Sequence, residues 1–232
     1  MSDIGYNILY YILPLLALII TSFAQIFLKT NYNKYKQVES SSRKHGNEVA
    51  RKILDKHGLS SIRIEEVSGD LTDHYDPTKK VVRLSSDIYN GTSIASVSVA
   101  AHECGHAIQD KIGYTPMRIR AKLVPIVNFS TKIGYIVIAI GLAAGFINLA
   151  TFGIILLLSM LLFQLVTLPV EFDASRRGKI ELDELQILNP SEQKGSAKVL
   201  RAAAFTYVAS VLSTLLQILR LLVIISSRRR RN

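Results

Sequence analysis

Apolar residues gather in four long blocks, and polar and charged residues fill the stretches between them. The blocks cover residues 8–28, 123–146, 149–170 and 203–225. Each is at least as long as the roughly 20 residues with which a helix crosses a hydrocarbon core of about 30 Å. The pattern predicts an α-helical membrane protein with three to four membrane helices. The leader before the first block holds neither Lys nor Arg, which favours a retained anchor over a cleaved signal peptide.

The order of the blocks divides the chain into five predicted parts. They are a first membrane helix (8–28), the first half of a polar domain (29–122), a transmembrane hairpin (123–170), the second half of the polar domain (171–202), and a fourth apolar helix with a basic tail (203–232). A short uncharged link joins the two arms of the hairpin, so the chain returns to the side that it left. Gly141 and Gly145 in the first arm are four residues apart, a spacing that allows close helix contact.

The first polar stretch predicts a small α+β domain. Ser40–Ser42 can cap a helix that ends at Gly58, because glycine readily takes the left-handed conformation that follows a helix. Alternating apolar and polar positions predict two short strands, at 62–67 and 80–85. Ser93 begins an apolar helix. The residues between these elements, among them Asp73–Pro77, read as turns.

The apolar helix after Ser93 contains the sequence His-Glu-Cys-Gly-His. On a helix, His102 and His106 leave the same face one turn apart, so their ring nitrogens can bind one zinc ion. Glu103 follows the first of these ligands and can face a zinc-activated water, as a general base must. Cys104 is the single cysteine of the chain, so no internal disulfide can form, and it reads as a small buried filler.

A catalytic zinc usually takes a third protein ligand, and Glu171 is the main candidate. It directly follows an apolar block, where an unpaired carboxylate would be costly and a metal ion would stabilise it. Three alternatives stay open. Asp173 or His74 can be the third ligand instead, or Glu171 can form an ion pair with a neighbouring arginine, at position 176 or 177.

The net charge of +10 comes mainly from Lys and Arg residues that flank the apolar blocks. This distribution is typical of topology signals and lipid-headgroup contacts, and no aromatic–basic motif for nucleic acid accompanies it. We expect no nucleic-acid partner. Positive charge on both sides of the hairpin places the active site on the cytoplasmic side of the cell membrane.

The last block conflicts with that topology. A fourth crossing would move the C-terminal arginines to the outer side, against the positive-inside rule, and Arg220 lies within the block. From the residues alone, both a spanning helix and a kinked or interfacial helix stay open.

Several segments together resemble a known family. They are Asp73-His74-Tyr75-Asp76-Pro77, Val82-Arg83-Leu84-Ser85, Tyr89-Asn90-Gly91, the zinc motif with its neighbours from Ala100 to Gln109, and Leu168-Pro169-Val170-Glu171-Phe172. The zinc motif, followed by a membrane hairpin and a Glu-x-Asp-Ala-Ser sequence, resembles the Glu-zincin (gluzincin) pattern of HtpX-like membrane metallopeptidases. More closely, the chain resembles the YugP-like family of neutral zinc metallopeptidases of the bacterial membrane.

The resemblance implies a zincin-like metalloprotease domain and one Zn²⁺ held by His102, His106 and Glu171, with Glu103 as base. In one respect the chain departs from the HtpX-like pattern, because Ser175 stands where that class has an Asp four residues after the ligand Glu. Asp173 is the carboxylate that could take over the support of a ligand histidine.

These observations predict a membrane-embedded zinc metalloendopeptidase whose polypeptide substrates are membrane or membrane-associated proteins. His74 and Tyr75 are the expected donors to the oxyanion, because their loop precedes the strand that should border the cleft. The strand at 81–85 is the expected site for an added substrate strand. The main alternative is a catalytically silent zinc-binding membrane adaptor or scaffold. A transporter is disfavoured, because the polar residues are not spread along the bilayer midplane.

Overall fold

The computed structural model describes residues 3–229, and Arg230 and Arg231 of the predicted basic tail lie outside the described residues. The elements in chain order are α1 (Asp3–Lys36), α2 (Gly46–Lys56), β1 (Arg63–Val67), β2 (His74–Asp76), β3 (Val81–Ser85), α3 (Ser86–Tyr89), α4 (Ile94–Lys111), α5 (Thr115–Ala143), α6 (Ile147–Glu184) and α7 (Pro190–Arg229). They form two compact units: a membrane unit (1–25, 119–168 and 206–232) and a site unit (26–118 and 169–205).

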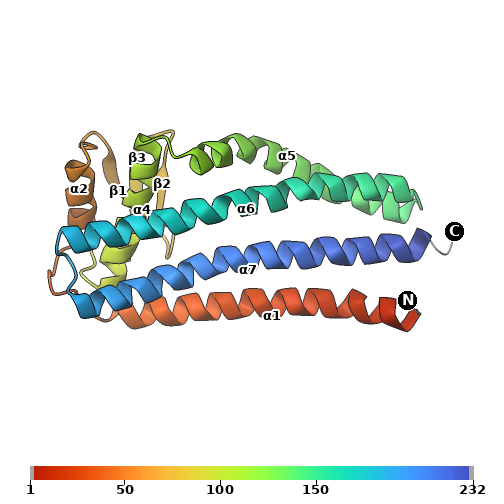
Figure 1. The fold of residues 1–232 in the computed structure, drawn as a ribbon, viewed down its shortest axis with the longest axis horizontal. Coiled ribbons are helices and arrows are strands. Elements are labelled where there is room, and N and C mark those ends of the chain that lie inside the picture. The colour runs from red at the N-terminus through yellow and green to blue at the C-terminus, as the bar shows by residue number, and fades with distance from the viewer. Residues whose placement is uncertain (1–2, 230–232) are drawn as a thin grey trace. The chain divides into compact units, whose positions relative to one another are not determined.

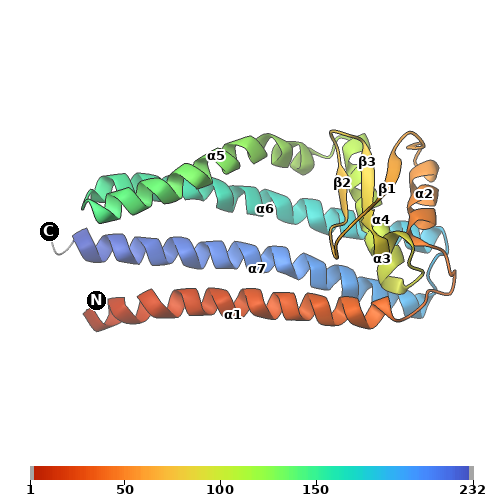
Figure 2. The same cartoon turned by 180° about the vertical axis from the view of Figure 1, so that it is seen from behind.

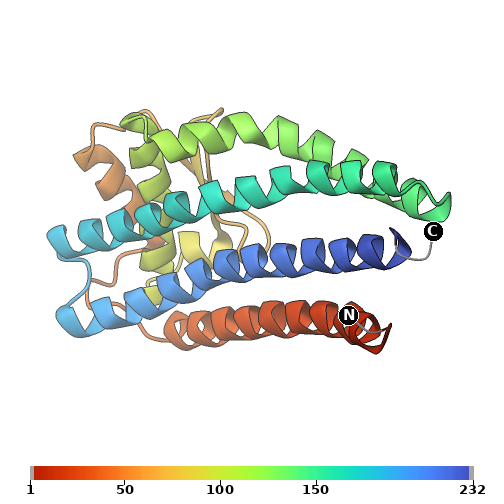
Figure 3. The same cartoon turned by 45° about the vertical axis from the view of Figure 1, so that its right-hand side comes forward.

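Four helices, α1, α5, α6 and α7, are long and apolar enough to cross a membrane. This confirms the prediction of a helical membrane protein, and the last apolar block belongs to α7, a helix of sufficient length. Within the membrane unit, α7 lies between α1 and α6 (Figures 1 and 3). A cluster of buried apolar side chains in this unit joins α5, α6 and α7, among them Ile138, Leu157 and Ile218.

Close packing of the α5–α6 hairpin depends on small residues, but not on both glycines of the predicted pair. A Cβ on Gly141 would stand 2.5 Å from the backbone nitrogen of Ala150, so a side chain there cannot be accommodated. Gly145 instead has φ +76° and lies in the turn after α5, with nothing near its Cβ position. The hydroxyls of Ser130 and Ser159 also bond across the two helices at 2.5 Å.

Gly141→Val should therefore destabilise the membrane unit. Overpacking of this kind typically costs about 1–3 kcal/mol, because backbone rather than a flexible side chain blocks the added methyl groups. Thermal unfolding in detergent measures the effect. Ala139→Val, on the exposed side of the same helix, is the matched control and should leave the melting temperature unchanged.

The site unit is the predicted small α+β domain. Its three-stranded sheet has the order β1-β3-β2, with β1 parallel and β2 antiparallel to β3 (Figure 2). The core joins β3 and helices α2 and α4, and its fully buried side chains include Val49, Ile53, Leu84 and Val97. The sequence pattern does not predict β2, because its three residues lie in a segment typical of turns.

Two local expectations need correction. The N-cap of α2 is His45, with the Glu48 carboxylate accepting from its backbone N–H, and not one of the serines at 40–42. The strand β3 is central, so both of its edges are already paired and it cannot receive a substrate strand. The polar stretch after Glu171, the predicted second half of the polar domain, forms the end of α6 and the start of α7.

Candidate metal site

The candidate site is built by two helices of the site unit, α4 and α6. The Ser93 hydroxyl caps α4 by accepting from the Ser96 N–H at 3.1 Å, as the sequence predicts for the start of this helix. Gly105 of α4 and Gly178 of α6 allow a close approach. A Cβ on Gly105 would stand 2.5 Å from the carbonyl oxygen of Ala174, and one on Gly178 would stand 2.9 Å from that of Ala101.

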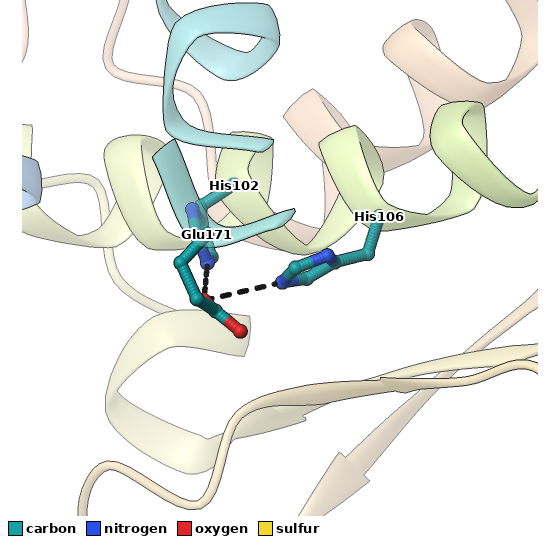
Figure 4. A group of neighbouring side chains, drawn as sticks. All are labelled: His102, His106 and Glu171. Carbon is teal, nitrogen blue, oxygen red and sulfur yellow. Dashed lines mark ion pairs between the residues drawn. The ribbon is translucent and has the colours of Figure 1, made fainter. Parts of the chain in front are cut away.

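The close approach brings His102 and His106 of α4 to Glu171 of α6 (Figure 4). We call these three residues the ligand cluster. One Glu171 carboxylate oxygen, Oε2, lies 3.4 Å from His102 Nε2 and 3.6 Å from His106 Nε2. The side chain of Glu171 is only 3% exposed. One ligand atom from each residue lies within 4.8 Å of the other two.

This donor set fits zinc. Two imidazole nitrogens and a carboxylate oxygen are ligands that catalytic zinc takes. Ligand atoms at about 2.0–2.2 Å from a tetrahedral ion stand about 3.3–3.6 Å apart, and both histidine-to-carboxylate distances match that range. Three protein ligands also leave a fourth position for water or substrate, as a catalytic site requires.

Both histidines are held by the ring nitrogen that faces away from the cluster. His102 Nδ1 is 3.1 Å from the Ser175 hydroxyl, and His106 Nδ1 is 3.0 Å from Gln109 Oε1. The Gln109 amide nitrogen donates to the Val170 carbonyl at 2.8 Å and to Asp173 at 3.0 Å. Its oxygen is therefore the acceptor toward His106, so Nδ1 carries the proton and Nε2 keeps the lone pair that binds a metal.

The expected support by Asp173 takes another form. Asp173 reaches His106 only through Gln109, and Ser175, where the HtpX-like pattern has a carboxylate, contacts His102 itself. Asp173 also accepts from Arg176 at 2.5 Å and from Arg177 at 2.6 Å. Both arginines thus pair with Asp173.

Ser175→Ala should lower zinc affinity by about 10-fold or more, because loss of the partner that orients a ligand histidine typically costs about 10–100-fold. Competition with a chromophoric chelator measures the affinity. Ser210→Ala, which removes an exposed hydroxyl bonded within its own helix, is the control. Equal affinities in wild type and Ser175→Ala would show that the Ser175 contact does not support the metal.

The structure places His74 and Tyr75 on β2, outside the ligand cluster. His74 is exposed, with Nδ1 2.8 Å from the Thr72 carbonyl and Nε2 3.3 Å from Arg83. Tyr75 is buried and its hydroxyl donates to Asp110 of α4 at 2.7 Å. Burial, together with the Asp110 carboxylate, raises the pKa of Tyr75, so its phenol keeps its proton at neutral pH.

Glu103 and Cys104 differ in their surroundings although they are neighbours. Glu103 is buried, with 7% of its surface exposed. Its side chain makes no hydrogen bond or ion pair with any described residue. Burial raises the pKa of Asp73, and the charge of Glu103 raises it further. The hydrogen bonds from Ser85 lower this pKa but do not outweigh the other two effects. Cys104 is fully buried, which confirms the prediction of a small buried filler, and burial raises the pKa of its thiol.

The ligand cluster also makes metal binding depend on pH. Burial alone would lower the pKa of His106, but the Glu171 carboxylate beside it outweighs burial and the pKa is raised. In the metal-free protein, this histidine stabilises the fold below its unfolded pKa of about 6.5, and that contribution is lost as pH rises through the folded pKa. Zinc needs the neutral ring, so protons compete with it.

We therefore expect zinc to raise the melting temperature more at pH 8 than at pH 6. The measurement is thermal unfolding with zinc and with chelator across this range. A zinc-dependent shift that stays constant, or that grows toward low pH, would contradict the linkage.

Two comparisons with known proteins give matches over most of the chain. Residues 10–226 match the model of a protein family described as "Putative neutral zinc metallopeptidase". The chain belongs to this family. It is also 44% identical over 224 residues to the "Putative membrane protease YugP" of Bacillus subtilis (strain 168). The matched region covers 97% of this chain and 100% of that protein. No solved structure matches the chain.

Family membership gives the site its chemical context. It implies zinc as the metal, a polypeptide as the substrate and hydrolysis as the reaction class, while the four apolar helices imply a lipid bilayer. Sequence reasoning missed Gln109 as a functional residue, although its position three residues after His106 on one helix was a usable signal.

Proposed function

We propose that this protein is a zinc-dependent endopeptidase in which His102, His106 and Glu171 hold one Zn²⁺ and Glu103 is the general base. The observation that carries the proposal is the buried ligand cluster, with both Nε2 atoms directed at one carboxylate oxygen and both Nδ1 atoms held from outside. When bound, zinc supplies a Lewis acid that polarises a carbonyl and makes water nucleophilic near neutral pH.

Glu103 suits the role of general base. It follows His102 on α4, and its buried carboxylate is not committed to any described partner. It can therefore accept the proton of the attacking water and later deliver that proton to the leaving amine. A structural metal site would have no use for such a group, which favours the peptidase over the zinc-binding adaptor.

His74 and Tyr75 remain our predicted donors to the oxyanion. Each would have to exchange its present partner, the Thr72 carbonyl or Asp110, for the substrate. The substitutions His74→Ala and Tyr75→Phe test them separately. A donor role predicts a lower kcat with little change in KM, because the interaction forms only in the transition state.

Because a substrate strand cannot add to β3, it would add to β2 instead. In the described sheet only one edge of β2 is paired. The charge of Glu103 contributes, after burial, to the raised pKa of Asp73, the residue that directly precedes this strand. An extended polypeptide on the outer edge of β2 would gain main-chain hydrogen bonds.

We further propose that the protein crosses the cell membrane several times with its active site on the cytoplasmic side. Basic residues accompany the site-unit parts of the chain on both sides of the hairpin. Arg228, at the other end of α7, donates to the Leu142 carbonyl, which lies in the last turn of α5 and lacks a partner within its helix. That contact lowers the cost of arginine at this end of the membrane unit.

Comparative proteomics of membranes from cells with the wild type or with Glu103→Gln tests the function. The proposal predicts membrane or membrane-associated proteins that are cut only in the wild type. If the protein were a zinc-binding adaptor, the wild type and Glu103→Gln would give equal proteomes. Only a variant that loses the ligand cluster would then differ from the wild type.

A further inference from the structure

The membrane unit contains a polar groove that the hydrolytic site does not use. It has a volume of about 380 Å³ and lies between α5 and α6. We define the polar groove by the residues that line it: Val127, Asn128, Thr131, Lys132, Met160, Phe163 and Gln164. Four of these seven residues are polar, in a part of the chain that otherwise has the composition of a membrane span.

Polar atoms in the groove lack partners. Thr131 Oγ1 and Gln164 Oε1 are both buried without a hydrogen bond. By contrast, Thr151 and Thr167 of α6 bond back to carbonyls four residues earlier, which is the usual way to satisfy a hydroxyl in such a helix. Lys132 makes no hydrogen bond or ion pair with any described residue. Within a membrane these groups call for a ligand that brings both donors and acceptors.

A second cavity, of about 250 Å³, adjoins the groove. Met160 lines both, and the second cavity also receives Ser213, Thr214 and Gln217 of α7. The polar lining therefore continues from α5 and α6 to a third helix. An isolated polar side chain would be tolerated without a function, but a lining shared by three helices indicates a built surface.

The depth of Lys132 restricts the occupant. In the membrane unit α5 runs from residue 119 to 143, so Lys132 lies 13 residues from one end and 11 from the other. At 1.5 Å per residue these distances are about 20 Å and 17 Å. Lipid headgroups lie at the interface and would not reach it, whereas a membrane-spanning segment of another protein places side chains at this depth.

We propose that the polar groove docks a membrane-spanning segment of a partner protein through an acidic side chain, Asp or Glu, in the middle of that segment. The ammonium of Lys132 pairs with the carboxyl group. Thr131 and Gln164 lie beside it and complete the hydrogen bonds of the paired segment. The proposal concerns binding and does not depend on peptide hydrolysis by the site unit. Gln164 nevertheless precedes Glu171 by only seven residues of α6.

The test uses the full-length protein in phosphatidylcholine nanodiscs and a synthetic Leu/Ala transmembrane peptide with one central Asp, labelled for energy transfer. The matched peptide has Leu at the centre. We expect the Asp peptide to bind about 3- to 30-fold more tightly, the range for a polar contact between membrane helices. Lys132→Met should remove this preference, and Lys132→Arg should keep it.

Lys122→Met, on the same helix near its start, is the control and should keep the full preference. The Glu103→Gln variant should show it as well, which separates docking from cleavage. Equal binding of the two peptides by the wild type, or an undiminished preference in folded Lys132→Met, would overturn the proposal. So would a preference that disappears when anionic phosphatidylglycerol replaces part of the lipid, because the groove would then hold a lipid.

Discussion

Glu103→Gln should bind zinc as the wild type does and cleave peptides about 10²–10⁴-fold more slowly, the usual contribution of a positioned general base. The amide keeps the size of the side chain, and Glu103 makes no hydrogen bond or ion pair in the described structure that the change would break. The ligand cluster should stay intact. Steady-state cleavage of an unstructured polypeptide and elemental analysis of the same sample measure both properties.

A matched control is Glu66→Gln, since Glu66 is an exposed glutamate of β1 whose side chain contacts Asn90. It should keep both zinc and activity. If Glu103→Gln retained near-wild-type cleavage, the assignment of the base would be wrong even with the metal site correct. If it lost zinc, the variant would report on the metal and not on proton transfer.

Glu171→Ala should have the second large effect, the loss of most bound zinc together with activity. It removes one of three proposed ligands and leaves two histidines on α4 alone. The affinity should fall by more than the roughly 10–100-fold expected for an outer partner such as Ser175. Because zinc would tie α4 to α6, chelation should also lower the melting temperature of the wild type but not of Glu171→Ala.

Glu184→Gln is the control for this experiment, because Glu184 lies on the same helix and pairs with Lys56 on the surface. Full zinc content in Glu171→Ala would remove Glu171 from the ligand cluster. An unchanged melting temperature in wild type with demonstrably empty sites would refute the link between metal and fold.

The long helices of the fold could be predicted from the sequence, but the residues at which they begin and end could not. The apolar blocks marked all four long helices, since a bilayer demands about 20 apolar residues wherever a helix crosses it. The polar ends of α6 and α7 continue these helices into the site unit, where packing rather than apolar composition supports them. The strand β2 has only three residues, too few for an alternating pattern to be visible.

The candidate site could be predicted where local geometry decides it. The spacing of His102 and His106 is a property of any helix, and Glu171 was suggested by the cost of a carboxylate after an apolar block. The positions of Gln109 and Ser175 against the histidines depend on how closely α4 and α6 approach. That approach is set by Gly105 and Gly178 across two distant segments, which no single-segment pattern encodes.

The most direct measurement is a zinc titration of the purified, metal-stripped protein, with peptide cleavage recorded at each step. We expect cleavage to be absent at the start and to rise linearly to a maximum at one zinc per chain. Glu171→Ala should fail to reach this maximum, and Glu103→Gln should bind the same single equivalent without cleavage. Cleavage by the metal-stripped protein, or full activity without added zinc, would show that the peptidase does not depend on zinc.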